Sequence, residues 1–179
     1  MSDRYPFERT GLWSAGHAAM PMSATLRAAI STDAEGIAEV LLASRTAFLP
    51  YAASAHTDGD VRTWVREVLL PSESVTVAVA NGRVVGVLAV AQRNGTSWLT
   101  QLYLHPAHVA QGIGSRLLAH AIATALAPIR LYTFQQSVGA RRFYERNGFL
   151  PIEFTDGSAN EEQCPDVLYE LASPFGVVA

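Results

Sequence analysis

The sequence predicts an α/β fold, organised as a single domain around a mixed, mostly antiparallel sheet flanked by helices. β-rich stretches alternate with segments whose apolar residues recur at helical spacing, and no internal repeat interrupts them. Two Asn-Gly pairs, at 81–82 and 94–95, separate three consecutive strand-like stretches. The 179 residues, 49% of them hydrophobic, suit one domain with a sizeable core. The expected order is strand, helix, helix, three strands, helix, strand, helix and two strands.

The first part of the domain is expected to hold a strand over 24–30 and two helices. Thr32 is followed three residues later by Glu35, which has the form of a capping box and predicts a helix start. A second helix is expected over 58–70 and should end at Pro71. Its predicted buried face consists of Val61, Trp64, Val65, Val68 and Leu69.

After Pro71 the spacing of apolar residues is no longer helical, and the remaining elements are predicted from the new pattern. The Asn-Gly turns predict an antiparallel meander of strands over 75–79, 84–90 and 97–104. Helices are then expected over 112–126 and 138–147, and strands over 129–134, 149–154 and 167–171. Gly148 follows the second of these helices, where a left-handed residue is needed.

Composition and charge exclude several classes of protein. A net charge of −3 argues against bulk attraction to nucleic acid or to an anionic membrane. No apolar run reaches the length of a membrane helix, and the N-terminus lacks the order of a secretory signal, so a soluble, cytoplasmic protein is expected. Cys164 is the only cysteine, which excludes an internal disulfide and a Cys-rich zinc site. No metal is expected.

Residues 1–21 show no clean period and are interpreted as an N-terminal extension, with the domain proper spanning 22–179. The segment contains Phe7, Leu12 and Trp13, which are costly to expose. The alternative is therefore an arm that packs on a partner chain, and the predicted oligomeric state is a monomer or a homodimer.

The segment 102–118 has the form of a phosphate loop. A strand ends, a short loop turns, and Gly112 and Gly114 open an amphipathic helix. Free amides at a helix start bind anions when no side chain blocks the approach. A P-loop is excluded because the chain has no lysine, and a dinucleotide fingerprint would need glycine where Leu117 stands. The structural alternative is a tight turn with close helix packing.

Charge is distributed unevenly around this loop. Residues 101–150 contain five arginines against one acid, Glu145, whereas 151–171 contain six acids and no base. One part of the domain would attract a polyanion and the other a cation. The pattern favours an anionic cofactor together with a basic substrate, although charged faces are often simply solvated.

Two motifs resemble the GNAT superfamily of N-acetyltransferases. The first is Leu104-His105-Pro106 followed by Gly112-Ile113-Gly114, which is similar to that family's acetyl-CoA loop, except that Val109 replaces an Arg or Gln. The second runs from Ser137 to Phe149 and reads SVGARRFYERNGF, departing only at Ser137, where the family has Asn. The resemblance covers roughly 24–171.

The resemblance implies direct transfer of an acetyl group from acetyl-CoA to a primary amine, with Tyr144 as the general acid that protonates the leaving thiolate. A phenol suits this role because its ordinary pKa is close to that of a thiol. The alternative for Tyr144 is a purely structural aromatic. The implied cofactor-binding residues are Leu102, Tyr103, Leu104, Val109, Ala110, Gln111, Gly112, Ile113, Gly114, Ser115, Ser137 and Arg142.

The general base is not evident, because Thr100 and Tyr132 occupy positions where the family often has a carboxylate. Glu161 and Glu162 are candidates to bind the acceptor's ammonium group or take its proton, and a chain of waters is another route. His56, Tyr51 and Asn160 are expected to bind the substrate. For Glu161, Glu162 and His56 the alternative is a solvated surface position.

Three functions are therefore compatible with these motifs. The first is acetylation of a small, cationic amine; the second is a non-catalytic acyl-CoA-binding module; the third is acetylation of a protein N-terminus or lysine. The departures from the family pattern at Val109 and Ser137, together with the absence of carboxylates at Thr100 and Tyr132, favour the second, whereas Tyr144 favours catalysis.

Overall fold

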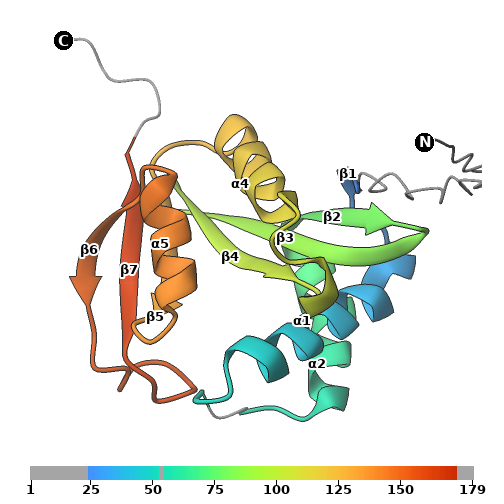
Figure 1. Cartoon of the computed structure of the whole chain (residues 1–179), viewed down its shortest axis with the longest axis horizontal. Helices are drawn as coiled ribbons and strands as arrows, with labels where there is room; N and C mark the ends of the chain where they lie inside the picture. The colour runs from blue at the N-terminus through green and yellow to red at the C-terminus, as the bar shows by residue number, and fades with distance from the viewer. Residues whose placement is uncertain (1–23, 53–54, 173–179) are drawn as a thin grey trace, which may run out of the picture.

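The computed structural model describes residues 24–52 and 55–172, which form a seven-stranded sheet with helices on both faces (Figure 1). The strand order is β1-β2-β3-β4-β5-β7-β6, and every neighbouring pair is antiparallel except β4 and β5. The predicted fold class and element order are confirmed. The predicted extension, 1–21, lies outside the described residues, and the domain bounds of 22–179 stay a prediction.

The first helix starts differently from the expected capping box. Strand β1 (Thr25–Ala28) leads into a short 3-10 turn (Ser31–Asp33) and then α1 (Ala34–Phe48). The cap is Asp33, whose Oδ2 accepts from Ile30 N at 2.8 Å and from Arg27 Nη1 at 2.6 Å. Glu35 instead pairs with Arg62, 2.8 Å away. The Thr32–Glu35 box was wrong because the first turn already begins at Ser31, so the capping contact is formed by Ile30 and Asp33.

The second helix is continuous from Asp58 to Ser72, but it changes winding. It comprises α2 (Asp58–Trp64), a π-helical turn (Val65–Leu69) and α3 (Leu70–Ser72), so Pro71 does not end it. The amide of Leu70 donates to Val65 O across the wider turn. This widening places Val65 and Leu69 in the core and turns Val68 outward, so Val68 is 49% exposed and the predicted buried face was wrong there.

The meander matches its prediction. Strands β2 (Ser74–Ala80), β3 (Arg83–Arg93) and β4 (Thr96–Leu104) pair antiparallel in sequence order. Both residues of each Asn-Gly pair have positive φ, from 51° to 76°. Such turns match the twist of the strands they join, which is why the two pairs predict hairpins.

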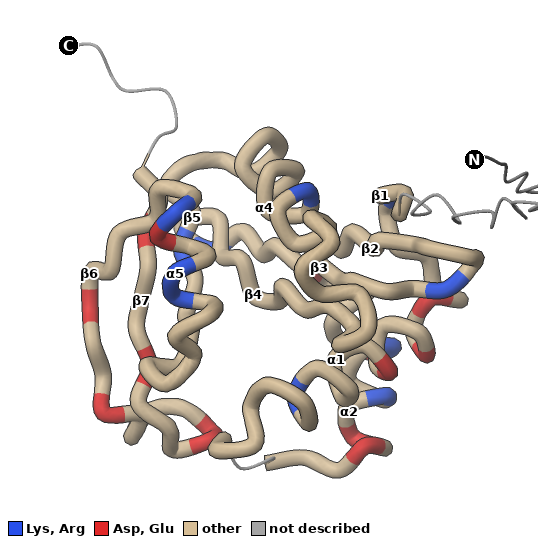
Figure 2. The backbone as a smooth tube through the Cα atoms, in the orientation of Figure 1, with Lys and Arg blue, Asp and Glu red and all other residues tan. Residues whose placement is uncertain are grey.

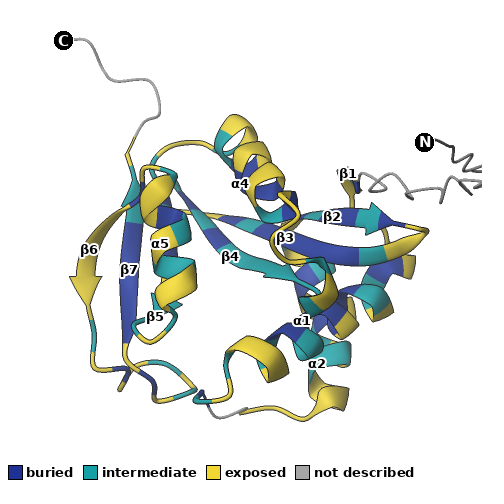
Figure 3. Cartoon of the chain, in the orientation of Figure 1, coloured by how far each residue is buried: buried dark blue, intermediate teal, exposed yellow. Residues whose placement is uncertain are grey.

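The second half supplies the elements around the candidate site. These are a 3-10 turn (Pro106–His108), α4 (Ile113–Thr124), β5 (Ile129–Phe134), α5 (Val138–Arg146), β6 (Leu150–Phe154) and β7 (Asp166–Leu171). Gly148 follows α5 with φ +86°, as expected. Strand β6 forms one edge of the sheet and is exposed along its length, whereas its neighbour β7 is largely buried (Figure 3).

Two hydrophobic clusters cover the two faces of the sheet. One joins α4 and α5 to the sheet through residues such as Leu117, Tyr144 and Phe149. The other joins α1 and the second helix through Ile37, Val65 and neighbours. In the described part of the chain, no helix combines the length and apolar character needed to cross a membrane.

Candidate active site

A cleft opens where β4 and β5 separate. The two strands pair only at Ser97 with Ile129 and at Trp98 with Arg130, and beyond these pairs they diverge. The resulting cavity of about 1180 Å³ is lined by α1, β4, β5, α5 and the loop between β6 and β7. Figure 1 shows β4 diverging from β5 and α5. The split strands therefore position the site.

A bulge in β4 lies at the split. Ala89 of β3 faces Gln101 and the next residue, Val90, faces Leu99, so Thr100 is an extra residue with no partner of its own. Bulges bend a strand and increase its twist. The Thr100 side chain lines the cleft, and its Oγ1 donates to the carboxylate of Glu73.

The N-terminus of α4 and the residues before it form one end of the cleft. Ala110 and Gly112 have φ values of +58° and +76°, and Arg116 N, which bonds to Gly112 O at 3.1 Å, is the first amide to close the helical ladder. The amides before it point out of the helix start with its positive dipole end. A Cβ on Gly112 would meet no atom within 4 Å, so the approach to this backbone is open. These features suit a phosphate group.

The predicted cofactor residues fall into two groups. Those that line the cleft are Leu102, Tyr103, Leu104, Val109, Ala110, Gly114 and Ser137. Those outside its lining are Gln111, Gly112, Ile113, Ser115 and Arg142. Ile113 is buried and anchors the helix, whereas the exposed Gln111 bonds back to Ala107 O at 3.1 Å. Their roles in binding stay predictions.

Tyr144 on α5 reaches the cleft from the core. Its ring packs edge-on against Phe143 and Phe149, with centroids 5.3 and 5.7 Å away, and the residue is 7% exposed. Among residues 24–52 and 55–172 no group is hydrogen-bonded to its hydroxyl. Burial raises the pKa of this phenol well above its usual range, and Tyr103 adds to the shift, so the hydroxyl stays protonated at neutral pH.

Polar side chains gather at the other end of the cleft. Arg45 of α1 pairs with Glu162 at 2.9 Å, and both are largely buried. Tyr51 shares a hydrogen bond of 2.5 Å with Ser137 Oγ. Burial raises the pKa of Tyr103, and the charge of Arg45 opposes that shift. Arg45 could not be identified from the sequence, because its partner Glu162 lies 117 residues away.

The two predicted carboxylates occupy different places. Glu162 lines the cleft, whereas Glu161 lies outside the lining with its side chain 71% exposed. Glu161 Oε2 lies 2.8 Å from His56 Nε2, which ties the loop to the segment before α2. Tyr51 and His56 do not line the cleft, whereas Asn160 does.

Asp166 was missed by sequence reasoning and is the most buried carboxylate of the cleft, at 8% exposure. It accepts from Thr155 Oγ1 at 2.5 Å and from Asn160 Nδ2 at 3.0 Å. These bonds hold the ends of the loop 155–165, which presents Glu162. Figure 2 shows acidic residues along β6, β7 and this loop, opposite basic residues on α5.

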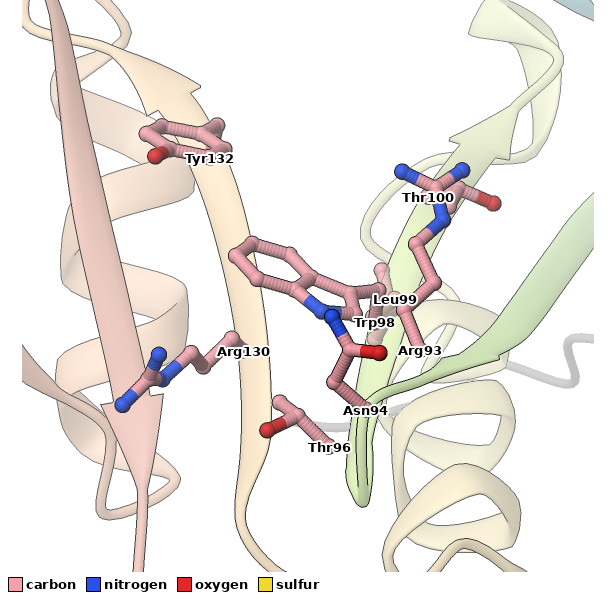
Figure 4. Close-up of a pocket in the computed structure, with 8 residues that line it drawn as sticks. All are labelled: Arg93, Asn94, Thr96, Trp98, Leu99, Thr100, Arg130 and Tyr132. Atoms are coloured by element: carbon pink, nitrogen blue, oxygen red, sulfur yellow. The ribbon is translucent and has the colours of Figure 1, made fainter.

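A second, smaller groove of about 600 Å³ adjoins the cleft. It is lined by side chains from β3, β4, β5 and the turn after β3, among them Trp98 and Tyr132, whose rings stack with centroids 5.9 Å apart (Figure 4). Thr100 and Tyr132 line both cavities. Within the described ranges, no three His, Cys, Asp or Glu side chains come together as a metal site.

Comparisons place this geometry among known proteins. A sequence model of the acetyltransferase (GNAT) family matches residues 39–149. A search of curated proteins found no match. Among solved structures, the PaiA N-acetyltransferase of Thermoplasma acidophilum, in complex with coenzyme A, is 24% identical with a TM-score of 0.68, covering 84% of this chain and 99% of that one.

Two further structures share the fold at lower identity. The ribosomal-protein-S18-alanine N-acetyltransferase of Escherichia coli is 15% identical, with a TM-score of 0.67, 85% of this chain covered and 95% of that one. A GNAT acetyltransferase of Bacillus cereus is 14% identical, with a TM-score of 0.65 and coverages of 84% and 97%. The family match spans more than half of the sequence, over the split strands, the glycine-opened helix and Tyr144. The chain therefore belongs to the GNAT family of acetyltransferases and is an acyltransferase.

Proposed function

We propose that this enzyme transfers the acetyl group of acetyl-CoA to a primary amine of a small, cationic molecule, with Tyr144 as the general acid. The observation that carries the proposal is a single cleft that joins three features: an open, glycine-rich helix start, a buried phenol ring whose hydroxyl no described residue hydrogen-bonds, and a polar end with excess negative charge. These three features correspond to the cofactor, the leaving group and the acceptor.

The residues present fit acetyl-CoA. The amides around Gly112 to Ser115 would hold its pyrophosphate, and the backbone of β4 from Leu102 to Leu104, which β5 leaves unpaired, would hold its pantetheine arm. A Cβ on Gly114 would lie 3.4 Å from the Leu104 side chain, so a larger residue there would narrow the cleft. When bound, the thioester supplies an activated acetyl group. Val109, which departs from the family pattern, contributes its backbone to this loop.

Tyr144 can give a proton to the departing sulfur. Desolvation raises the pKa of its phenol, and the same cleft would raise the pKa of a thiol, because both groups form anions that water would otherwise stabilise. The two proton affinities therefore move in the same direction. Because no described residue is hydrogen-bonded to this hydroxyl, no bond within 24–52 and 55–172 has to break before it donates. This supports catalysis over a module that only binds acyl-CoA.

A small acceptor is favoured over a peptide by the contacts that bridge the far end of the cleft. Glu162 pairs with Arg45 and Glu161 with His56, so the loop 155–165 is tied both to α1 and to the segment before α2. Figure 1 shows these segments meeting below the split strands. A protein N-terminus or lysine would need this end to open.

The cationic character of the acceptor rests on the charges that line the cleft. One guanidinium, Arg45, faces two carboxylates, Glu162 and Asp166, which leaves one negative charge in excess. Arg45 offsets Glu162, and both oxygens of Asp166 accept from neutral donors. An ammonium group would therefore be attracted toward Asp166 and Asn160.

Two experiments test the proposal. Thermal unfolding with acetyl-CoA at about 100 times its Kd should show stabilisation of roughly 2.7 kcal/mol, or about 5–11 °C for a chain of this size. Thiol release should then be followed with a panel of polyamines, amino acids, arylalkylamines and a lysine peptide. Turnover with the peptide alone would refute the small acceptor, and stabilisation without any turnover would favour the binding module.

A further inference from the structure

The side chain of Thr100 connects the cleft to a carboxylate behind it. Thr100 is the bulged residue of β4 at the point where β4 and β5 part, and it lines both the cleft and the adjoining groove (Figure 4). Its Oγ1 donates a short hydrogen bond to Glu73 Oε2, whereas its alternative acceptor, Ala89 O, lies 3.3 Å away. The hydroxyl proton is therefore directed at Glu73.

Glu73 is held in place by the end of the second helix. Its amide donates to Leu69 O at 3.1 Å, and its side chain is only 10% exposed. The charged group that faces it is Arg93 of β3, whose Nη2 lies 4.0 Å from Glu73 Oε1 and whose side chain is 63% exposed. Arg93 also lines the adjoining groove, whose other titratable groups are Arg130 and Tyr132 of β5. Glu73 therefore presents one carboxylate oxygen to a close hydroxyl, while the other oxygen lies 4.0 Å from the guanidinium of Arg93.

A hydroxyl whose proton is donated to a carboxylate has its lone pairs left to accept. In Thr100 these lone pairs are on the side of the oxygen away from Glu73, and the residue lines the cleft in which an amine would lie.

We propose that Thr100 takes the proton of the acceptor amine while passing its own proton to Glu73, so that Thr100 is the catalytic residue and Glu73 positions and drives it. This rests on the proposed function. As the amine nitrogen bonds to the acetyl carbon, the carbon–sulfur bond breaks. One amine proton moves to Thr100 Oγ1, the Thr100 proton moves to Glu73 Oε2, and Tyr144 protonates the sulfur. Glu73 then releases its proton to solvent and Tyr144 regains one.

The test compares Glu73→Gln, Thr100→Val and Thr100→Ser with Glu67→Gln, an exposed glutamate on the same helix, as the matched control. The assay is thiol release from acetyl-CoA with the best amine of the panel, across pH 5 to 10. Glu73→Gln and Thr100→Val should lower kcat by about 10²–10⁴-fold. The acceptor's KM should stay within about threefold, and Thr100→Ser should restore most of the rate because it keeps the hydroxyl.

The rescue pattern separates proton transfer from a structural role. Thr100→Ser keeps the hydroxyl that the relay needs and should restore kcat, whereas Thr100→Val keeps only the shape of the side chain and should not. Values of kcat within about threefold of the wild type in both Glu73→Gln and Thr100→Val would overturn the pair. If kcat instead falls only in Glu162→Gln, the base is Glu162 and the pair is refuted.

Thermal stabilisation by acetyl-CoA, measured together with turnover, distinguishes failure of the Thr100–Glu73 proposal from failure of the proposed function. A wild type that acetylates no amine overturns both proposals. A wild type that turns over, beside a Glu73→Gln that is stabilised by acetyl-CoA and equally active, overturns only the Thr100–Glu73 pair. If Glu73→Gln does not fold, Thr100→Val with rescue by Thr100→Ser decides the question, because valine has the shape of threonine without its hydroxyl.

Discussion

Replacement of Gly157 by alanine should disrupt the acceptor end of the cleft through a backbone collision. Gly157 lies in the loop 155–165 with φ +83°, and it is buried. A Cβ at this position would stand 2.3 Å from Cys164 C and 2.4 Å from Cys164 O. No side-chain rotation relieves such a contact, because both atoms belong to the backbone. The loop must therefore move.

The expected loss of folding stability in Gly157→Ala has two contributions, and a matched control variant separates them. An L-residue with left-handed backbone costs about 1–2 kcal/mol, and a forced overlap in a packed region costs about a further 1–3 kcal/mol. Gly82 has a similar φ of +73° but no atom within 4 Å of a Cβ, so Gly82→Ala has only the first cost. Gly157→Ala should thus be less stable than Gly82→Ala by about 1–3 kcal/mol, or roughly 2–12 °C.

The assay is urea or thermal unfolding of both variants, with and without acetyl-CoA. Because the start of α4 lies at the other end of the cleft from this loop, acetyl-CoA should stabilise Gly157→Ala nearly as much as the wild type. The acceptor's KM should rise, since Asn160 and Glu162 are carried by the displaced segment. Equal unfolding temperatures for the two variants would show that Gly157 does not pack on Cys164 as described.

Three further substitutions probe other parts of the site and the fold. Tyr144→Phe should lower kcat by about 10²–10⁴-fold in the thiol-release assay, yet leave the unfolding temperature nearly unchanged, because the lost hydroxyl has no hydrogen-bond partner among the described residues. Gly114→Val should fold, since a Cβ there makes an ordinary contact of 3.4 Å with Leu104, but a thermal shift with acetyl-CoA should be reduced or absent. The Arg27 side chain, which hydrogen-bonds to Asp33, lowers the pKa of that carboxyl in the folded state. The contribution of the Arg27–Asp33 pair to the free energy of unfolding is therefore fully present above the unfolded-state pKa of about 3.9. It is lost as the pH falls through the lower pKa of the folded state. Urea unfolding from pH 6 down to pH 2 should show this loss in the wild type and a weaker one in Asp33→Asn.

The order of elements could be predicted because its signals are local. Asn81-Gly82 and Asn94-Gly95 adopt the positive φ values that two-residue hairpins require, and Gly148 ends α5 as a glycine in that position should. The second helix shows the limit of such reasoning. A regular period of 3.6 residues places Val68 inside, whereas the π turn at Val65–Leu69 turns it outward. Local pattern does not reveal a change of winding.

The contacts that build the site could not be predicted, because they join distant segments. Arg45 and Glu162 are separated by 117 residues, and Glu73 meets Thr100 across 27 residues and two turns. The spacing of these residues in the sequence does not distinguish them from polar side chains that are simply solvated. The motifs around Gly112 and Tyr144 were found because each is contiguous in sequence and lies on one helix start or one helix face.

The proposed positive charge of the acceptor rests on a different carboxylate in the fold than in the sequence. In the sequence, the adjacent Glu161 and Glu162 give the loop its negative character. In the fold, Arg45 opposes Glu162, and Glu161 lies outside the lining of the cleft within hydrogen-bond distance of His56, so neither supplies an uncompensated charge to the cleft. The excess negative charge belongs to Asp166, whose partners are neutral and which is buried where the loop begins and ends. Because the field of a buried charge is less screened by water than that of an exposed one, this single carboxylate is expected to govern which amines enter.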